Sequence, residues 1–179
     1  MKMGFVDAVT EGLSEMAQSM LFAALPQALE ETIGERAAAA LLLRVFSHAA
    51  YDGFKRFIER MDRGLELSII DVLSVFTESF PVHHPFRVFA SIEVKEDMVR
   101  LYCGRCKCRG CSLVSMATIV GTIEGVLRAV GVKAKAVLTS AGLQALCRSR
   151  GEDTTVIYPE NTEGSCRVVV KRLRCRASG

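Results

Sequence analysis

Hydrophobic and polar positions follow two different periods along this chain, and the change falls near residue 80. Before it, apolar residues recur at steps of three and four, the spacing of one face of a helix. This spacing predicts helices over 5–24 and 35–62. A shorter helix is expected after Ser68, which has the N-cap position of a capping box with Asp71 three residues later.

Three positions shape this helical half. Pro26 is expected to break or restart the first helix, and Gly34 to separate it from the second. On the second helix, Ala49 and Gly53 share the apolar face, where small side chains would let another helix approach closely. This face is therefore a candidate surface for contact with a partner or for a dimer.

After the two-proline connector "FPVHHPF" the period drops to two, which is typical of strands. A hairpin is expected around "KED", followed by a helix that begins after Ser112 and ends at Gly131. A short strand at 133–139, a short helix from 140 and two closing strands at 154–159 and 166–173 complete the pattern. The layout predicts one α+β domain over residues 1–179, with N-terminal helices followed by an antiparallel sheet that carries a packed helix.

Composition narrows the class of protein. Of the 179 residues, 50% are hydrophobic and 24% are charged, which is typical of a globular domain. The net charge of +3 favours no particular partner, and the basic tail "KRLRCRASG" gives only a weak case for nucleic acid. Asp7 and Glu11 argue against a secretory signal, and the apolar run "AAAALLLRVF" is too short to span a membrane. We therefore expect a cytoplasmic location and reduced cysteines.

The candidate chemistry lies in "YCGRCKCRGC", which places Cys103, Cys106, Cys108 and Cys111 within nine residues. Thiolates suit zinc and iron–sulfur clusters. One intervening residue between the two C-x2-C pairs leaves little chain to wrap an ion with all four. Two or three of them, completed by a distant cysteine, form an easier site, and the distant candidates are Cys147 and Cys166. Disulfides such as Cys103–Cys111, a redox role, and a cluster without chemistry are the alternatives.

Other motifs add little to the case for an enzyme. Gly121 and Gly125, four residues apart, favour a close helix-packing face over a phosphate loop. His83 and His84 between two prolines are candidates for a metal or a turn. The sequence contains no G-x-S-x-G, no H-E-x-x-H and no dinucleotide-binding glycine loop. No catalytic residue is assigned.

The order of elements is similar to that of 4-vinyl-reductase-type domains, which share a fold with subunits of the TRAPP vesicle-tethering complex. "RGCSLVSMATIVGTIEGVLRAVG" resembles the central signature of the family, with Cys111, Gly121 and Gly125 at its characteristic positions. "EGSCRVVV" resembles the closing strand, with Val168 in place of a Phe. The likeness covers residues 30–172 and leaves 1–30 as an N-terminal helical extension.

This resemblance implies a dimeric domain that holds a small apolar ligand between helices and sheet. In sensory members, cysteines equivalent to Cys111 and Cys166 help to bind a structural zinc near the pocket, together with a Glu and a further Cys. Here that E-x2-C pair is missing, so Cys147, Cys106 or Cys108 would have to complete the set. We expect a ligand-binding or sensory domain with a structural zinc; the alternatives are a redox-switched protein and a nucleic-acid-binding module.

Overall fold

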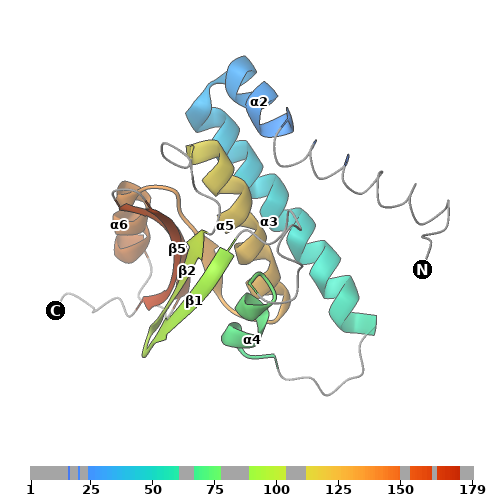
Figure 1. Ribbon diagram of the computed structural model, residues 1–179, viewed down its shortest axis with the longest axis vertical. Helices are drawn as coiled ribbons and strands as arrows, with labels where there is room; N and C mark the ends of the chain where they lie inside the picture. Colours follow the sequence, from blue (N-terminus) through green and yellow to red (C-terminus); the bar gives the residue numbers. More distant parts are fainter. Residues whose placement is uncertain are drawn as a thin grey trace.

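The computed structural model describes residues 24–60, 67–77, 89–103, 112–149, 154–162 and 165–173, together with Met16 and Met20. Helices come first and a sheet follows, as expected (Figure 1). In chain order the elements are α2 (Leu25–Ile33), α3 (Glu35–Arg60), α4 (Ile69–Ser74), β1 (Phe89–Lys95), β2 (Met98–Cys103), α5 (Leu113–Ala129), β3 (Ala134–Ala136), α6 (Ser140–Ser149), β4 (Thr154–Thr162) and β5 (Ser165–Leu173).

The five strands form one mixed sheet in the order β1-β2-β5-β4-β3. The α+β class is confirmed, but the expectation of a wholly antiparallel sheet is wrong at one edge. There β3 pairs in parallel with β4, while the other three pairings are antiparallel. The parallel pair arises because α6 connects β3 to β4, and a parallel neighbour needs such a crossover.

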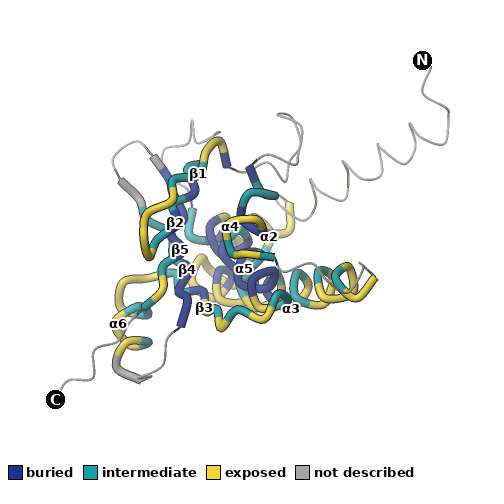
Figure 2. Tube along the Cα trace, turned by 90° about the horizontal axis from the view of Figure 1, so that it is seen from below, coloured by how far each residue is buried: buried dark blue, intermediate teal, exposed yellow. Residues whose placement is uncertain are grey.

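Helices cover the sheet unequally. In Figure 1, α3 and α5 lie on one side of the sheet, and α6 lies on the other. Burial is concentrated in α5 and the central strands, as Figure 2 shows in dark blue. The main core cluster joins α5 to the inner face of the sheet through Met116, Val120, Ile123, Leu127, Leu101, Ile157, Val168 and Val170. None of the described helices has the length and apolar composition needed to cross a membrane.

The ends of α5 match the sequence prediction. Ser112 is the N-cap, and its hydroxyl accepts a hydrogen bond from the Ser115 backbone N–H at 3.1 Å. The Leu113 N–H, another donor that the helix leaves unpaired, is bound by the Glu35 carboxylate at 3.3 Å. Gly131 has a positive φ of 84°, which a residue with a side chain adopts only with strain. Residues at the two ends of α5, Ser112 and Gly131, therefore set the direction in which the chain enters and leaves this helix.

Close packing of α5 against α3 occurs through Gly121 and Gly125, as the sequence predicted. A Cβ atom added to Gly121 would lie 2.6 Å from the backbone oxygen of Leu43. One added to Gly125 would collide with the backbone of Ser47. By contrast, Gly53 of α3 is exposed, with nothing within 4 Å of its added Cβ. The helix contact inside the chain therefore does not use the Ala49–Gly53 face.

The smaller helices begin and end as expected. Pro26 lies in the first turn of α2, where its missing N–H leaves no bond unmade. Gly34 ends α2 with φ 80°. Ser68 and Asp71 form a complete capping box at the start of α4. The helix predicted over 5–24 lies outside the described residues, apart from Met16, Met20 and Ala24.

The hairpin is confirmed, and its first strand carries an irregularity near its start. Phe89 is buried, whereas Ala90 and Val94 are exposed. The pairing with β2 shifts by one residue between Phe89 and Ser91, which marks a β-bulge. A one-residue shift exchanges the two faces of a strand. Beyond the bulge, Ile92 and Val94 pair with the buried Leu101 and Val99, and Val94 and Val99 together line a cavity at the hairpin end of the sheet.

Candidate functional site

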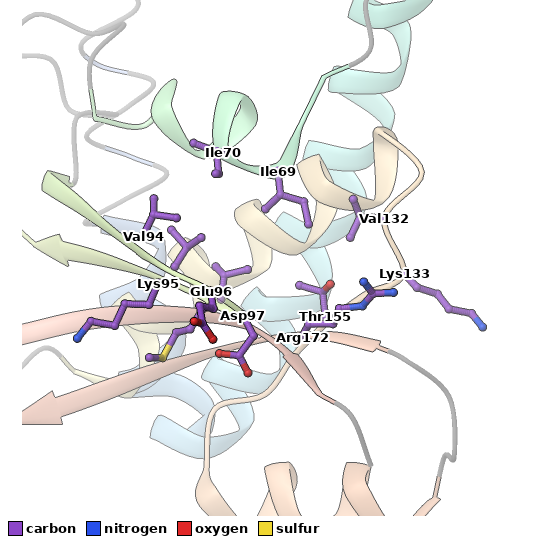
Figure 3. Close-up of a pocket in the computed structure, with 13 residues that line it drawn as sticks. Ile69, Ile70, Val94, Lys95, Glu96, Asp97, Val132, Lys133, Thr155 and Arg172 are labelled. Carbon is purple, nitrogen blue, oxygen red and sulfur yellow. The ribbon is translucent and has the colours of Figure 1, made fainter. Parts of the chain in front are cut away.

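An open cavity of about 430 Å³ lies between α4 and the hairpin end of the sheet. Figure 3 shows Ile69 and Val94 approaching this space from α4 and from β1, with Val132 on a third side. We call it the apolar cavity. It is lined by Ile69, Ile70, Val94, Lys95, Glu96, Asp97, Met98, Val99, Val132, Lys133, Thr155, Val170 and Arg172.

The position of each wall of the apolar cavity follows from a nearby feature of the chain. The capping box starts α4 at Ile69, so the half-buried Ile69 and the exposed Ile70 of its first turn both line the cavity. The positive φ of Gly131 turns the chain out of α5 and places Val132 at the opening. Val99 and Val170 are paired across β2 and β5 and lie at its base. The cavity volume falls within the usual range for small-molecule sites.

Charged side chains fix the hairpin that forms one wall. The Tyr102 hydroxyl donates to the Glu93 carboxylate at 2.6 Å, and Lys95 and Arg100 lie 2.9 and 3.3 Å from it. The hydrogen bond from Tyr102 is the largest of the effects that lower the pKa of Glu93 to about 2, and bonds from Lys95 and Arg100 add to it. At the turn, Lys171 lies 3.8 Å from Asp97, which joins the hairpin to β5.

A second candidate site lies at the opposite end of the same two strands. Tyr102 pairs with Arg167, so Cys103 and Cys166 occupy the next position in the register of β2 and β5. Directly opposed residues have Cβ atoms about 4.5–5.5 Å apart. Cys103 follows Leu101 by two residues and Cys166 precedes Val168 by two, so both side chains share the buried face of the sheet. We call these two residues the cross-strand cysteine pair.

The state of the thiols differs within the pair. Cys166 is disulfide-bonded, whereas Cys103 and Cys147 are not in disulfides. Because Cys103 is not in a disulfide, the Cys103–Cys111 bridge considered from the sequence is not formed. The candidates Cys106, Cys108 and Cys111, and also His83 and His84, lie outside the described residues. Within the described ranges, no three His, Cys, Asp or Glu side chains are arranged to hold a metal.

Cys147 does not join the pair. It lies exposed on α6, next to Leu146, which lines a cavity at Thr154, the start of β4. Cys166 pairs with Asn161 near the far end of that strand. Thr154 and Asn161 lie seven residue steps apart along β4, or about 23 Å at about 3.3 Å per step. The proposal that Cys147 completes a metal site with Cys166 has no support from this arrangement.

The apolar cavity and the cysteine pair are also separated. Met98, at the cavity, and Cys103 lie five residue steps apart along β2, or about 17 Å. The zinc that the family resemblance places near the ligand is therefore at the other end of the sheet if the cysteine pair holds it. Sequence reasoning missed the cavity residues because they come from five separate stretches of the chain. Only Gly131, as a turn before Val132, gave a signal.

Comparison with known proteins adds no assignment: no family model matches the chain, and none of the curated proteins matches it.

Proposed function

We propose that this chain is a binding domain for a small apolar molecule, with a sensory role in which the bound ligand alters contacts with another chain. The apolar cavity is the observation that carries this proposal. Burial of a ligand against Ile69, Val94, Val99 and Val132 would supply the affinity, at about 25 cal/mol per Å² of apolar area. The hairpin charges would orient it at the rim.

A neutral fluorescent probe tests this proposal directly. N-phenyl-1-naphthylamine, which is uncharged and brightens in apolar sites, is titrated into the full chain. The test variant is Ile70→Gln with Val94→Gln, since both side chains are exposed and line the cavity. The control is Leu25→Gln with Ile33→Gln, which are similarly exposed apolar residues of α2 outside the cavity.

Saturable binding of one probe per chain, weakened about tenfold in the cavity variant alone, would support the proposal, because polar groups there remove part of the buried apolar area. Absence of saturable binding, or equal weakening in both variants, would reject the apolar cavity as the site.

A structural zinc is the second part of the proposal. The register that sets Cys103 beside Cys166 supports it, because two thiolates at this spacing form half of a tetrahedral site. Cysteines from the motif that follows Cys103 would complete the set. Zinc binds thiolate, so this state requires Cys166 to be reduced. A disulfide switch at Cys166 is the competing function, and it is favoured by the bond that this residue forms.

A homodimer formed through the exposed face of α3 is the third part. Val45, Ala49, Gly53 and Phe57 are all exposed there, and Phe57 is 51% exposed. Large apolar side chains on one helix face favour an interaction surface. Light scattering coupled to gel filtration tests this: the wild type should have twice the chain mass, and Val45→Glu with Phe57→Glu should have the mass of one chain. A monomeric wild type would contradict it.

A further inference from the structure

The cross-strand cysteine pair places a thiol directly opposite a disulfide. Cys166 is disulfide-bonded, and Cys103, its neighbour across the ladder, is not in a disulfide. Cys103 packs against the main core cluster, on the face of the sheet that Cys166 also occupies. Both sulfur atoms therefore lie on the side of the sheet that α5 covers.

The hydrogen bonding of β2 with β5 sets the spacing of this pair. The Arg172 backbone N–H donates to the Asp97 carbonyl at 3.1 Å, so these two residues form a hydrogen-bonded pair. The two kinds of pair alternate along an antiparallel ladder, and the cysteines lie six residues further along. They are thus a pair of the same kind, with Cα atoms about 5.5 Å apart. This separation is within the range of about 4.4–6.8 Å that a disulfide can bridge.

We propose that Cys103 and Cys166 form a thiol–disulfide exchange switch, in which Cys103 displaces the sulfur that is bonded to Cys166. The Cys103 thiolate attacks the Cys166 Sγ, so that a Cys103–Cys166 bond forms and the existing S–S bond breaks. The displaced sulfur leaves as a thiolate and takes up the proton that Cys103 has lost. One disulfide and one thiol are present before and after, so the step needs no oxidant or reductant.

Burial decides which thiol can attack Cys166. This residue is 4% exposed, so a thiol in solution has almost no access to its sulfur. Cys103 is held on the adjacent strand and reaches the same sulfur without an approach through solvent. Attack from within the chain is therefore favoured over attack by a small thiol such as glutathione.

The place of the pair at the strand ends lets the new bond form and break. Opposed residues have Cβ atoms about 4.5–5.5 Å apart, whereas those of a disulfide are about 3.5–4.5 Å apart. The two strands must therefore approach by about 1 Å, at the point where β2 ends with Cys103 and β5 begins with Ser165. Because this approach costs energy, the cross-strand bond is easily reversed, as a switch requires.

The switch belongs to the oxidised chain and goes beyond the proposed binding function. Neither disulfide state leaves two thiolates at the pair, so zinc binding is confined to the reduced chain. In the switched state β2 and β5 are joined covalently, and a thiol is released on the displaced sulfur. The inference does not depend on the apolar cavity, so the two are tested separately.

Disulfide mapping tests the switch. The full chain is purified without reductant, incubated at pH 8, quenched with acid before and after incubation, and digested with pepsin for mass spectrometry. Thiols per chain are counted in the same samples. The test variant is Cys103→Ser. The matched control is Cys147→Ser, because Cys147 is an exposed cysteine on α6 that does not join the pair.

Before incubation, Cys166 should be bonded to a cysteine other than Cys103. The Cys103–Cys166 peptide should then appear in the wild type and in Cys147→Ser, with an equal fall in alkylation of Cys103 and no change in thiols per chain. Cys103→Ser should keep its original bond throughout. A circular dichroism spectrum equal to that of the wild type shows that this variant is folded, and Cys103→Ala repeats the result with a different side chain.

Three results would overturn the inference. If no Cys103–Cys166 peptide appears, Cys103 does not attack. If the peptide appears with a loss of two thiols per chain, the bond arises by oxidation and not by exchange. If Cys166 is not disulfide-bonded in the purified chain, the step has no leaving group and the switch fails, while the binding proposal is unaffected.

Discussion

Gly121 of α5 and Leu43 of α3 approach so closely that a Cβ on the glycine would lie 2.6 Å from the leucine carbonyl oxygen. Backbone cannot move aside as a flexible side chain can. Replacing Gly121 or Gly125 with Ala should therefore lower the free energy of unfolding by about 1–3 kcal/mol, the usual cost of overpacking. Urea unfolding followed by circular dichroism measures this.

Gly53→Ala is the matched control, because Gly53 is exposed and helical with nothing near its added Cβ. It should raise stability by up to about 1 kcal/mol through helix propensity. A stabilising effect at Gly121 as well would show that the two helices are further apart than this structure has them.

The capping box of α4 should matter for both stability and ligand binding. The Ser68 hydroxyl accepts from the Asp71 N–H at 3.1 Å, and the Asp71 carboxylate accepts from the Ser68 N–H at 2.9 Å. Ser68→Ala should cost about 1 kcal/mol. Because α4 carries Ile69 and Ile70 to the apolar cavity, the same change should weaken binding of the neutral probe.

Ser74→Ala provides the comparison for this prediction. Among the described residues its hydroxyl donates to the Ile70 carbonyl inside the same helix, so its loss should change little. Equal effects of the two substitutions would mean that the cap has no special role in holding α4.

Glu93 should contribute to stability in a pH-dependent way. Its pKa is about 2 in the folded chain against an ordinary value of 4.5, chiefly because of the hydrogen bond from Tyr102. A lowered carboxyl pKa gives stability that is present above pH 4.5 and is lost as the pH falls toward 2. Glu93→Gln should therefore be less stable than the wild type at pH 7, with a gap that shrinks between pH 4.5 and 2.

Urea midpoints at pH 7, 4 and 2.5 measure that gap. Glu96→Gln, at the exposed turn of the same hairpin, removes the same charge without these partners and should show a smaller gap at pH 7. A gap for Glu93→Gln that does not change with pH would contradict the pKa of about 2.

The zinc proposal predicts about one zinc per chain in protein purified under reducing conditions, measured by mass spectrometry. Cys103→Ser and Cys166→Ser should each lose the metal, because each removes one thiolate of the cross-strand pair. Cys147→Ser should keep it, since this exposed residue lies near the start of β4.

Thiol counts separate zinc from the competing redox function. If the reduced protein holds no metal, and reduction raises the thiol count by two per chain, the disulfide of Cys166 is the chemistry of this end of the sheet. If Cys147→Ser lost its zinc, the proposed ligand set would be wrong, because Cys147 would then contribute to the metal site.

Local chemistry explains which parts of the fold the sequence could predict. Ser68, Ser112, Gly34 and Gly131 act on the backbone beside them, so the helix ends were predictable from single residues. The parallel pairing of β3 with β4 depends on where α6 directs the chain, which no local pattern encodes. The bulge after Phe89 likewise shifts the pairing of the strand by one residue, and the pattern of hydrophobic and polar residues in the sequence does not mark its position.

The face of α3 that packs against α5 was harder to predict from the sequence, because the helix is apolar on more than one side. Ala49 and Gly53 matched the helical spacing, yet α5 packs against the backbone at Leu43 and Ser47. Small residues on α5 decide that contact, and they lie some 80 residues further along the chain. The cavities depend on side chains brought together from separate segments, and for this reason neither was predictable.

The two strands β2 and β5 connect the candidate sites mechanically. Val99 and Val170 pair at the base of the apolar cavity, and Cys103 and Cys166 follow at the other end of the same ladder. A metal that clamps the cysteine end would hold these strands in one register and limit fraying toward the cavity. Thermodynamic linkage then makes the effect mutual: a chelator should loosen the ligand, and the ligand should tighten the metal by the same factor.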